Sequence, residues 1–303
     1  MTVLLTGGTG FVGSYVLKAI LAQTNEQVVL LKRSSSDVSR IADELHNPRL
    51  ICYDVDKTIL EDIFKKHAIQ TIIHIATEYG RGENPEVKVL ETNLMFPIRL
   101  IDVGLKYGLK TFINTDSYFN KEGLSYNYLL HYSLSKKSLL LWLKYYAGRM
   151  TVINLALEHP YGAFDGKAKF TEQMIRQIAI EKIPQINLTA GEQKRDFIYV
   201  KDVANAYIAA LDFATRGKPS FYNFEIGTGQ AVSIRHFVQT VKQVSGSNTQ
   251  FNYGVIAYRA DEIMCSVADT SNHTLLNWKP NYTLENALKE IIVIYQGATK
   301  CHS

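Results

Sequence analysis

Two residues four positions apart, Tyr132 and Lys136, have the types and spacing needed to transfer a proton. If the segment is helical, this spacing places both side chains on one face of the helix. An ammonium group close to a phenol lowers the phenol pKa from about 10 towards neutral pH. The phenol then exchanges a proton with an alkoxide or an alcohol. A second pair with this spacing, Tyr53 and Lys57, follows a predicted strand end, and we interpret it as accidental.

A segment rich in hydroxyl groups ends the fifth predicted strand and offers a third partner. It reads Asn114-Thr115-Asp116-Ser117. Ser117 is the first candidate to hydrogen-bond a reacting oxygen, and Thr115 is the second. Serine and threonine at strand ends also bind local backbone groups. The catalytic interpretation of Ser117 therefore depends on its combination with Tyr132, Lys136 and the glycine motif described next.

A glycine-rich turn joins the first predicted strand to the first predicted helix. It contains G-x-G-x-x-G within Thr6-Gly7-Gly8-Thr9-Gly10-Phe11-Val12-Gly13. Glycines allow the backbone to approach a pyrophosphate closely, and the helix N-terminus offers free N–H groups to the anion. The position directly after the first strand makes the motif a strong indication of a dinucleotide site. The expected contacts are Gly7, Gly10, Phe11 and Val12.

The end of the second predicted strand indicates which dinucleotide binds. An enzyme that uses NAD carries Asp or Glu about 20 residues after the motif. Here Lys32 takes that place, followed by Arg33 and Ser34. Cations and hydroxyls suit a 2′-phosphate, so the sequence favours NADPH, with NADH as the alternative. Further cofactor contacts are expected after the third and fourth strands, from Asp54, Val55, Ala76 and Thr77.

Short apolar runs alternate with helical patterns over the first half of the chain. The alternation predicts an α/β fold with a Rossmann-type, doubly wound parallel sheet. The expected strands are Val3–Leu5, Val28–Leu31, Leu50–Tyr53, Thr71–Ile75, Thr111–Asn114 and Thr151–Leu155, with a later one at Tyr222–Ile226. The expected helices are Val12–Ala22, Ser36–Leu45, Leu60–Lys66, Val87–Tyr107, Tyr128–Arg149, Phe170–Ala179, Val200–Phe213, Ile234–Val244 and Leu284–Tyr295.

The pattern also predicts two domains. Residues 1–155 are expected to bind NADP(H), with segments of 195–230 returning to this domain. Residues 156–303 are expected to form a smaller α/β domain that binds substrate. We find no linker or repeat between them.

Composition excludes several other classes of protein. The 303 residues are 46% hydrophobic and 20% charged, with a net charge of +4, so neither disorder nor a dedicated nucleic-acid surface is expected. Three scattered cysteines predict neither disulfides nor a metal site. No apolar run is long enough for a membrane span, and glycines occur as early as residue 7. We therefore expect a cytoplasmic protein.

Together these motifs resemble the extended short-chain dehydrogenase/reductases that act on nucleotide sugars. The resemblance extends along nearly the whole chain. The segment from Gly191 to Val203 looks like the family's R-D-F-x-x-V-x-D-V element, and Tyr258–Glu262 resembles its later arginine segment. The resemblance implies that Arg195 and Arg259 bind the nucleotide diphosphate. It also implies a homodimer built from the helices at Val87–Tyr107 and Tyr128–Arg149.

The family contains several chemistries, and the resemblance favours ketone reduction. The 4,6-dehydratases carry Thr-Asp-Glu where this chain has Thr115-Asp116-Ser117. The bifunctional 3,5-epimerase/reductases need a cysteine and a histidine, and this chain has no cysteine between Cys52 and Cys265. The 4-epimerases usually hold NAD and carry an acidic end on the second strand. A simple reduction by exchangeable NADPH remains.

One subgroup looks closest, the CDP-abequose synthase-like and dTDP-4-keto-6-deoxyglucose reductase-like enzymes of surface-polysaccharide pathways. Pro160 and Ala163 depart from the usual loop pattern of the family. By position, the resemblance implies further substrate contacts from His159, Lys169, Phe170 and Leu188, alongside Thr115. For His159, a hydrogen-bonded loop histidine is an equally good interpretation.

The expected reaction is reduction of the C4 ketone of a nucleotide-linked 4-keto-6-deoxyhexose, with dTDP-4-keto-6-deoxyglucose giving dTDP-fucose as the first choice. Tyr132 would protonate the alkoxide, Ser117 would polarise the carbonyl, and Lys136 would orient the nicotinamide ribose. The alternatives are reduction of a CDP-linked 4-keto-3,6-dideoxyglucose, a nucleotide-sugar 4-epimerase, and a non-enzymatic regulator that senses NADPH. No membrane or nucleic-acid partner is expected.

Overall fold

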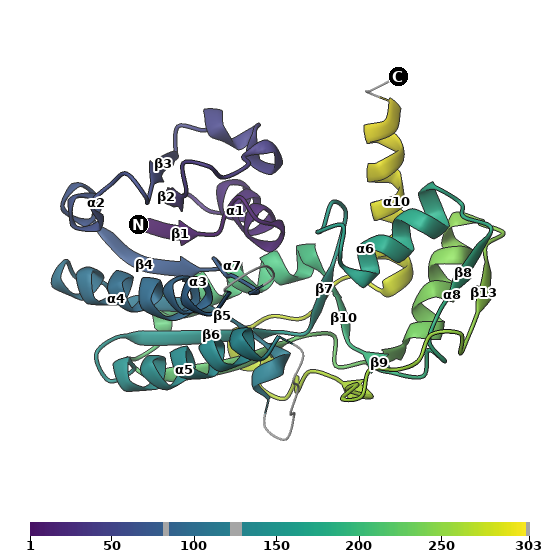
Figure 1. The fold of residues 1–303 in the computed structure, drawn as a ribbon. Helices are drawn as coiled ribbons and strands as arrows, with labels where there is room; N and C mark the ends of the chain where they lie inside the picture. The colour runs from purple at the N-terminus through teal and green to yellow at the C-terminus, as the bar shows by residue number, and fades with distance from the viewer. Residues whose placement is uncertain (81–84, 122–128, 301–303) are drawn as a thin grey trace. The chain divides into compact units, whose positions relative to one another are not determined.

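The structure is a computed structural model that describes residues 1–80, 85–121 and 129–300 (Figure 1). The chain forms two compact units. The first contains Met1–Leu157, Ala204–Glu225 and Asn272–Trp278. The second contains Glu158–Val203, Ile226–Ser271 and the chain from Lys279 onward.

A seven-stranded sheet forms the centre of the first unit, in the order β11-β6-β5-β4-β1-β2-β3. The strands from β1 to β6 pair in parallel. Their bounds are β1 Thr2–Thr6, β2 Gln27–Lys32, β3 Leu50–Asp54, β4 Ile69–His74, β5 Thr111–Ser117, β6 Thr151–Leu157 and β11 Phe221–Ile226. The predicted α/β class and the Rossmann-type sheet are confirmed. The strand order reverses between β1 and β4, and in such sheets ligands bind at this point, beyond the carboxyl ends of the strands.

Helices cover both faces of this sheet. On one face, α2 (Leu60–Lys66), α4 (Phe96–Lys106) and α5 (Leu130–Tyr146) bury Phe64, Leu100 and Leu143 against Leu4 and Phe112. Neighbouring residues of a strand point to opposite faces. The other face therefore meets α1 (Phe11–Gln23) and α7 (Val200–Arg216), and Tyr207 of α7 reaches Thr115 there. All-round burial explains why these strands are continuous apolar runs rather than alternating ones.

Three predicted helices differ in the structure, and one of them, Phe170–Ala179, is α6 (Phe170–Ile175) followed by a π-helical turn at Arg176–Ile180. The segment predicted as a helix at Ser36–Leu45 instead forms two short 3-10 turns, Ser39–Ile41 and Glu44–His46. Local side-chain bonds, such as Ser39 N–H to the Asp37 carboxylate at 2.9 Å, compete with helical hydrogen bonding there. The segment predicted at Val87–Tyr107 is α3 (Pro85–Leu90) followed by a π-helical turn at Glu91–Met95 and then α4. Tyr128 of the predicted helix Tyr128–Arg149 lies outside the described residues.

The second unit is smaller and is built from short strands and three helices. Its strands are β7 His159–Tyr161, β8 Gln185–Asn187, β9 Lys194–Arg195, β10 Phe197–Tyr199, β12 Val232–Ser233, β13 Gln250–Asn252 and β14 Cys265–Ser266. Its helices are α6 Phe170–Ile175, α8 Ile234–Ser245 and α10 Leu284–Lys300, and a π-helical turn at Arg176–Ile180 follows α6. Aromatic rings of Tyr161, Phe197 and Phe237 pack together in its core.

A short helix, α9 (His273–Leu276), returns to the first unit. Within the described ranges, no helix is long and apolar enough to cross a membrane.

Candidate active site

The glycine turn has the geometry of an anion cradle. Gly7 adopts a φ of +74°, and the Gly10 N–H donates to its carbonyl at 3.0 Å. A Cβ atom on Gly13 would lie 2.0 Å from the Gly7 carbonyl oxygen, and one on Gly7 would lie 2.5 Å from the Ala76 nitrogen. Gly10 caps α1 without any side-chain hydrogen bond, so no side chain takes up the cap position at the start of the helix. These features fit a pyrophosphate, which needs close backbone approach and open N–H donors.

Thr6 links this turn to the end of β4 through hydrogen bonds. Its hydroxyl lies 2.8 Å from His74 Nδ1 and accepts the N–H groups of Ile75 at 3.2 Å and Ala76 at 3.3 Å. Burial lowers the pKa of His74 to about 3, so the ring is neutral at physiological pH. The Ala76 backbone is thereby held beside Gly7, where a Cβ atom on residue 7 would clash with it.

The three predicted catalytic residues come together at the carboxyl end of β5 and the start of α5. Ser117 and Tyr132 share a side-chain hydrogen bond. The Lys136 Nζ lies 5.9 Å from the centre of the Tyr132 ring and donates to the Thr115 carbonyl at 2.8 Å. All three side chains are buried. The hydroxyl of Thr115, predicted to contact substrate, is hydrogen-bonded to the Tyr207 hydroxyl on α7.

The electrostatics of this group correct one expectation. Burial raises the pKa of Tyr132 well above its ordinary value, with smaller increases from Tyr79 and Asp116 and a decrease from the Ser117 hydrogen bond. The prediction was that Lys136, together with a bound nicotinamide, lowers the Tyr132 pKa; in the structure, burial instead raises it. Burial also lowers the pKa of Lys136 to about 8, against the opposing charge of Asp116. A phenol that stays protonated at neutral pH suits proton donation to an alkoxide.

Asn93 is a site residue that the sequence reasoning missed. It is fully buried in the π-helical turn at Glu91–Met95. Its side-chain oxygen accepts the Glu78 N–H at 2.7 Å and the Thr77 hydroxyl at 3.3 Å. Its amide nitrogen donates to the Glu78 carbonyl at 2.8 Å and to the Ser135 hydroxyl at 3.0 Å. Asn93 thus links the loop after β4 to α5 next to Lys136, and a lone helical asparagine gave no sequence signal of this.

A ring from that same loop packs on the phenol of Tyr132. Tyr79 stacks on Tyr132 with ring centres 5.0 Å apart and planes 22° apart. Phe119 meets Tyr132 edge-on at 6.1 Å. Behind them, the buried Asp116 carboxylate accepts from Asn120 at 2.7 Å and from Asn154 at 3.1 Å, and burial raises its pKa. Tyr132 therefore lies in a packed and largely aromatic environment.

The strand ends beyond β2 and β3 are less cationic than the sequence implies. Lys32 forms an ion pair with Asp54, its register partner on β3. Asp54 was predicted to contact the cofactor, and its carboxylate is occupied by this lysine. Val55 donates its N–H to the Lys32 carbonyl at 2.8 Å. Arg33 is exposed, and no ion pair joins it to any residue that the structure describes.

The second unit holds the predicted contacts to the nucleotide sugar. His159 Nδ1 lies 3.3 Å from a carboxylate oxygen of Glu158, which is buried and also accepts the Ser266 hydroxyl at 2.7 Å. Burial lowers the pKa of His159, and Glu158 opposes the shift. Arg195 forms an ion pair with Glu262, and its charge acts on His159. The structure thus brings His159 and Arg195 together.

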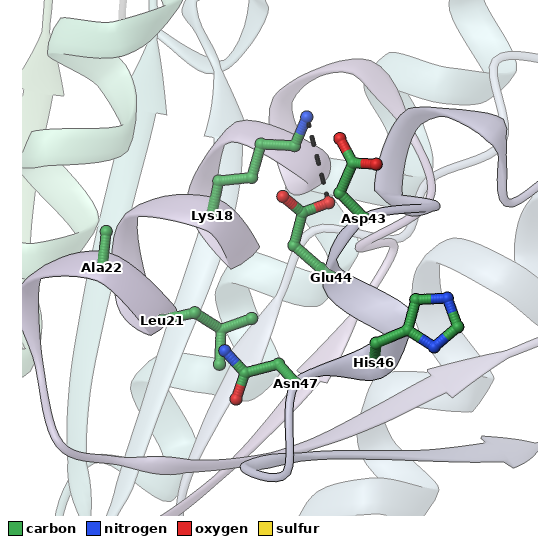
Figure 2. A pocket seen from close by; sticks show the side chains of 7 residues that line it. All are labelled: Lys18, Leu21, Ala22, Asp43, Glu44, His46 and Asn47. Carbon is green, nitrogen blue, oxygen red and sulfur yellow. Dashed lines mark ion pairs between the residues drawn. The ribbon is translucent and has the colours of Figure 1, made fainter.

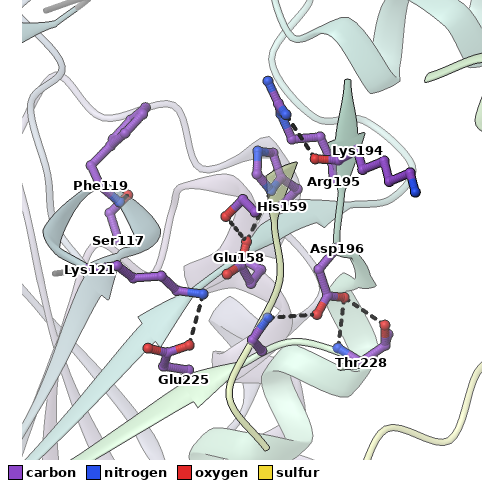
Figure 3. A network of polar contacts seen from close by, with 12 residues as sticks. Ser117, Phe119, Lys121, Glu158, His159, Lys194, Arg195, Asp196, Glu225 and Thr228 are labelled. Atoms are coloured by element: carbon purple, nitrogen blue, oxygen red, sulfur yellow. Dashed lines mark hydrogen bonds and ion pairs between the residues drawn. The ribbon is translucent and has the colours of Figure 1, made fainter. Parts of the chain in front are cut away.

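A buried carboxylate fixes the backbone beside Arg195. Asp196 accepts hydrogen bonds from the Thr228 N–H at 2.8 Å, the Thr228 hydroxyl at 2.6 Å and the Ala268 N–H at 3.1 Å, and Figure 3 shows part of this network. The other predicted contacts occupy separate parts of the unit. Lys169 and Phe170 lie at the start of α6, Leu188 is buried after β8, and Arg259 lies in the loop after β13. Their roles remain predictions.

A pocket in the first unit lies away from the glycine turn. It is formed by the later part of α1 and the 3-10 turn at Glu44–His46, where Lys18 and Glu44 approach to 3.9 Å (Figure 2). None of the predicted site residues lines it. We therefore assign the chemistry to the carboxyl edge of the sheet.

The fold and the glycine turn are those of an oxidoreductase of the Rossmann type that binds a dinucleotide. The chain belongs to the NAD dependent epimerase/dehydratase family, whose pattern matches residues 3–227. The predicted family is confirmed.

Relatives of known name are similar over nearly the whole chain. A CDP-abequose synthase of Salmonella typhimurium is 33% identical over 294 residues, which cover 96% of this chain and 97% of that protein. A dTDP-4-dehydro-6-deoxyglucose reductase of Escherichia coli is 25% identical over 96% of each chain. The crystal structure of a UDP-glucose 4-epimerase from Thermotoga maritima superposes with a TM-score of 0.84 at 23% identity, covering 99% of this chain and all of that one. This last similarity concerns the fold.

Proposed function

We propose that the protein reduces the C4 ketone of a nucleotide-linked 4-keto-6-deoxyhexose. The observation that carries the proposal is the grouping of Ser117, Tyr132 and Lys136 at the same edge of the sheet as a glycine turn fit for a dinucleotide. The similarity to a CDP-abequose synthase favours a CDP-linked 4-keto-3,6-dideoxyglucose as substrate. This reverses the order of preference given by the sequence. The dTDP-linked sugar is now second, supported by the more distant reductase.

The chain's own residues supply binding and proton transfer. The nicotinamide, when bound, supplies the hydride that attacks C4. Ser117 hydrogen-bonds the carbonyl oxygen, and Tyr132 donates its proton to that oxygen as it becomes an alkoxide. The Lys136 ammonium has three donors, and one of them goes to the Thr115 carbonyl. The others are assigned to the ribose hydroxyls of the cofactor. Fixed donors aimed at the developing charge account for most of the acceleration.

The first experiment measures NADPH oxidation with the CDP-linked and the dTDP-linked keto sugars in parallel. Rapid oxidation with the CDP-linked sugar alone is the expected result. Oxidation with the dTDP-linked sugar alone would restore the sequence-based preference. Oxidation with neither, combined with NAD that stays bound through purification, would contradict the reductase and indicate a 4-epimerase.

We propose that NADPH is the preferred cofactor and that Arg33 binds its 2′-phosphate. Lys32 is neutralised by Asp54, so Arg33 is the cation available for a 2′-phosphate. Replacement of Arg33 by alanine is expected to weaken NADPH binding roughly 10- to 100-fold, as expected for losing a hydrogen bond to a charged group. NADH binding should not change. The same measurement on Lys32→Ala serves as the control, with a smaller loss expected; equal losses for both cofactors would refute the role of Arg33.

We propose a homodimer formed through α3 and α5. Leu130, Leu134, Leu141 and Tyr145 lie on one side of α5, and Leu141 and Tyr145 are 69% and 66% exposed. Val87 of the adjoining α3 is 72% exposed. An exposed face rich in apolar side chains, interrupted here by Lys137, is typical of an interface between copies of a chain.

Leu141→Glu is expected to convert the dimer into a monomer, because the new charge would be buried without a partner. Light scattering coupled to size-exclusion chromatography measures the mass directly. Val293→Glu is the matched control, since Val293 is 65% exposed on α10 in the second unit. A wild-type protein that elutes as a monomer would refute the interface.

A further inference from the structure

Two carboxylates offset most of the positive charge at the ends of β2 and β3. Lys32 and Lys57 both face Asp54, the first as a close ion pair and the second at 4.0 Å. Directly beyond them, a second carboxylate, Asp56, lies against Ser34. In this fold, the end of the strand after the glycine turn is where the 2′ position of the adenosine ribose is read. A carboxylate at this place affects the choice between a hydroxyl and a phosphate.

Asp56 is held in the way that a phosphate would be held. The Ser34 N–H donates to one carboxylate oxygen at 2.7 Å, and the Ser34 hydroxyl donates to the other at 2.5 Å. Two donors from one residue thus bind two oxygens of one anion. Ser34 was predicted to supply these donors to the cofactor. Asp56 and a 2′-phosphate therefore compete for the same two groups.

We propose that Asp56 is a specificity-determining residue that limits the preference for NADP(H) and lets NAD(H) bind. The proposal depends on the proposed function, in which a dinucleotide binds at the glycine turn. A 2′-phosphate must displace the carboxylate from Ser34 and then lie near a like charge. A 2′-hydroxyl needs neither step. Arg33 attracts the phosphate and Asp56 opposes it, so the balance between them sets the cofactor ratio.

Two further observations support this role. The hydrogen bonds from Ser34 lower the pKa of Asp56, so its charge is present at neutral pH. The side chain is exposed, so it is able to move away when a phosphate binds. The Arg33 N–H donates to the Ser36 hydroxyl at 3.1 Å, which shapes the turn that presents Ser34.

The test is a fluorescence titration of the full-length protein with NADPH and with NADH, which needs no sugar substrate. For Asp56→Asn, affinity for NADPH should increase about tenfold, as expected for removing a like charge at contact distance from a phosphate dianion. Affinity for NADH should not change. Asp37→Asn is the matched control, because Asp37 carries the same charge in the loop that contains Ser34 but binds Ser39. It should alter the ratio of the two affinities much less.

A second variant tests the competition itself. Ser34→Ala combined with Asp56→Asn should lose part of the gain in NADPH affinity, because the hydroxyl donor is then missing. An Asp56→Asn protein with an unchanged or lowered preference for NADPH would overturn the proposal, as would an equal effect of Asp37→Asn. If the wild-type protein binds neither NADPH nor NADH, the proposed function itself fails, and that outcome is distinct from the others.

Discussion

Replacement of Tyr132 by phenylalanine is expected to reduce turnover about 10²- to 10⁴-fold, the usual contribution of a positioned general acid. The variant keeps the ring that packs on Tyr79 and Phe119, so the fold of α5 should persist. What it removes is the proton for the alkoxide and the hydrogen bond to Ser117. Steady-state rates of NADPH oxidation with the keto sugar measure the loss.

The effect should fall on chemistry and not on cofactor affinity. The glycine turn and Arg33 are unchanged in Tyr132→Phe, so NADPH titration should give the wild-type dissociation constant. Tyr145→Phe is the control, because Tyr145 lies on the same helix and the change keeps the ring on the proposed dimer face. It should keep wild-type turnover. Wild-type activity in Tyr132→Phe would exclude the phenol as the proton donor and with it the proposed mechanism.

The sequence predicted the sheet well because buried parallel strands leave a strong local pattern. Val28–Leu31 and Thr151–Leu155 are continuous apolar runs, and both lie inside strands of the structure. The helix predicted at Ser36–Leu45 was wrong because local side-chain bonds outweigh the helical pattern there. Its serine and aspartate side chains bond the nearby backbone, and periodicity does not register that competition.

The grouping of Ser117, Tyr132 and Lys136 could also be predicted, because each follows the end of a predicted strand, while their catalytic roles stay a proposal. Ser117 ends β5, and Tyr132 and Lys136 lie on one face of the helix that follows. The residues that the sequence did not reveal form hydrogen bonds to segments that are distant along the chain. Asn93 connects the loop at Thr77 to Ser135, and Asp56 reaches back to Ser34 across 22 positions. Such contacts between neighbouring strand ends depend on the register in which the strands pair. The sequence does not show that register directly.

The charge at the β2 end illustrates the same limit. Lys32 and Arg33 look equivalent in the sequence, and both were assigned to a 2′-phosphate. The parallel register places Lys32 opposite Asp54, while Arg33 lies one position beyond the strand. Because Lys32 pairs with Asp54, only Arg33 keeps, among these two cations, a charge unpaired by any residue that the structure describes. The sequence alone does not distinguish the two residues in this way.

Gly13→Ala is expected to abolish the binding of NADPH and NADH alike, by on the order of a hundredfold or more. Helix propensity alone favours alanine over glycine by about 1 kcal/mol, so a purely local argument predicts a stabilised α1. Sterics decide the other way, because the new Cβ atom would lie 2.0 Å from the Gly7 carbonyl oxygen, which belongs to the backbone of the turn. The turn must open, and the N–H groups that face the pyrophosphate move with it.

Gly148→Ala is the control, since a Cβ atom there meets nothing within 4 Å, and it should bind both cofactors normally. Fluorescence titration measures binding, and thermal unfolding shows whether the variant remains folded. A folded Gly13→Ala protein with wild-type affinity for NADPH would show that the cofactor does not bind at this turn.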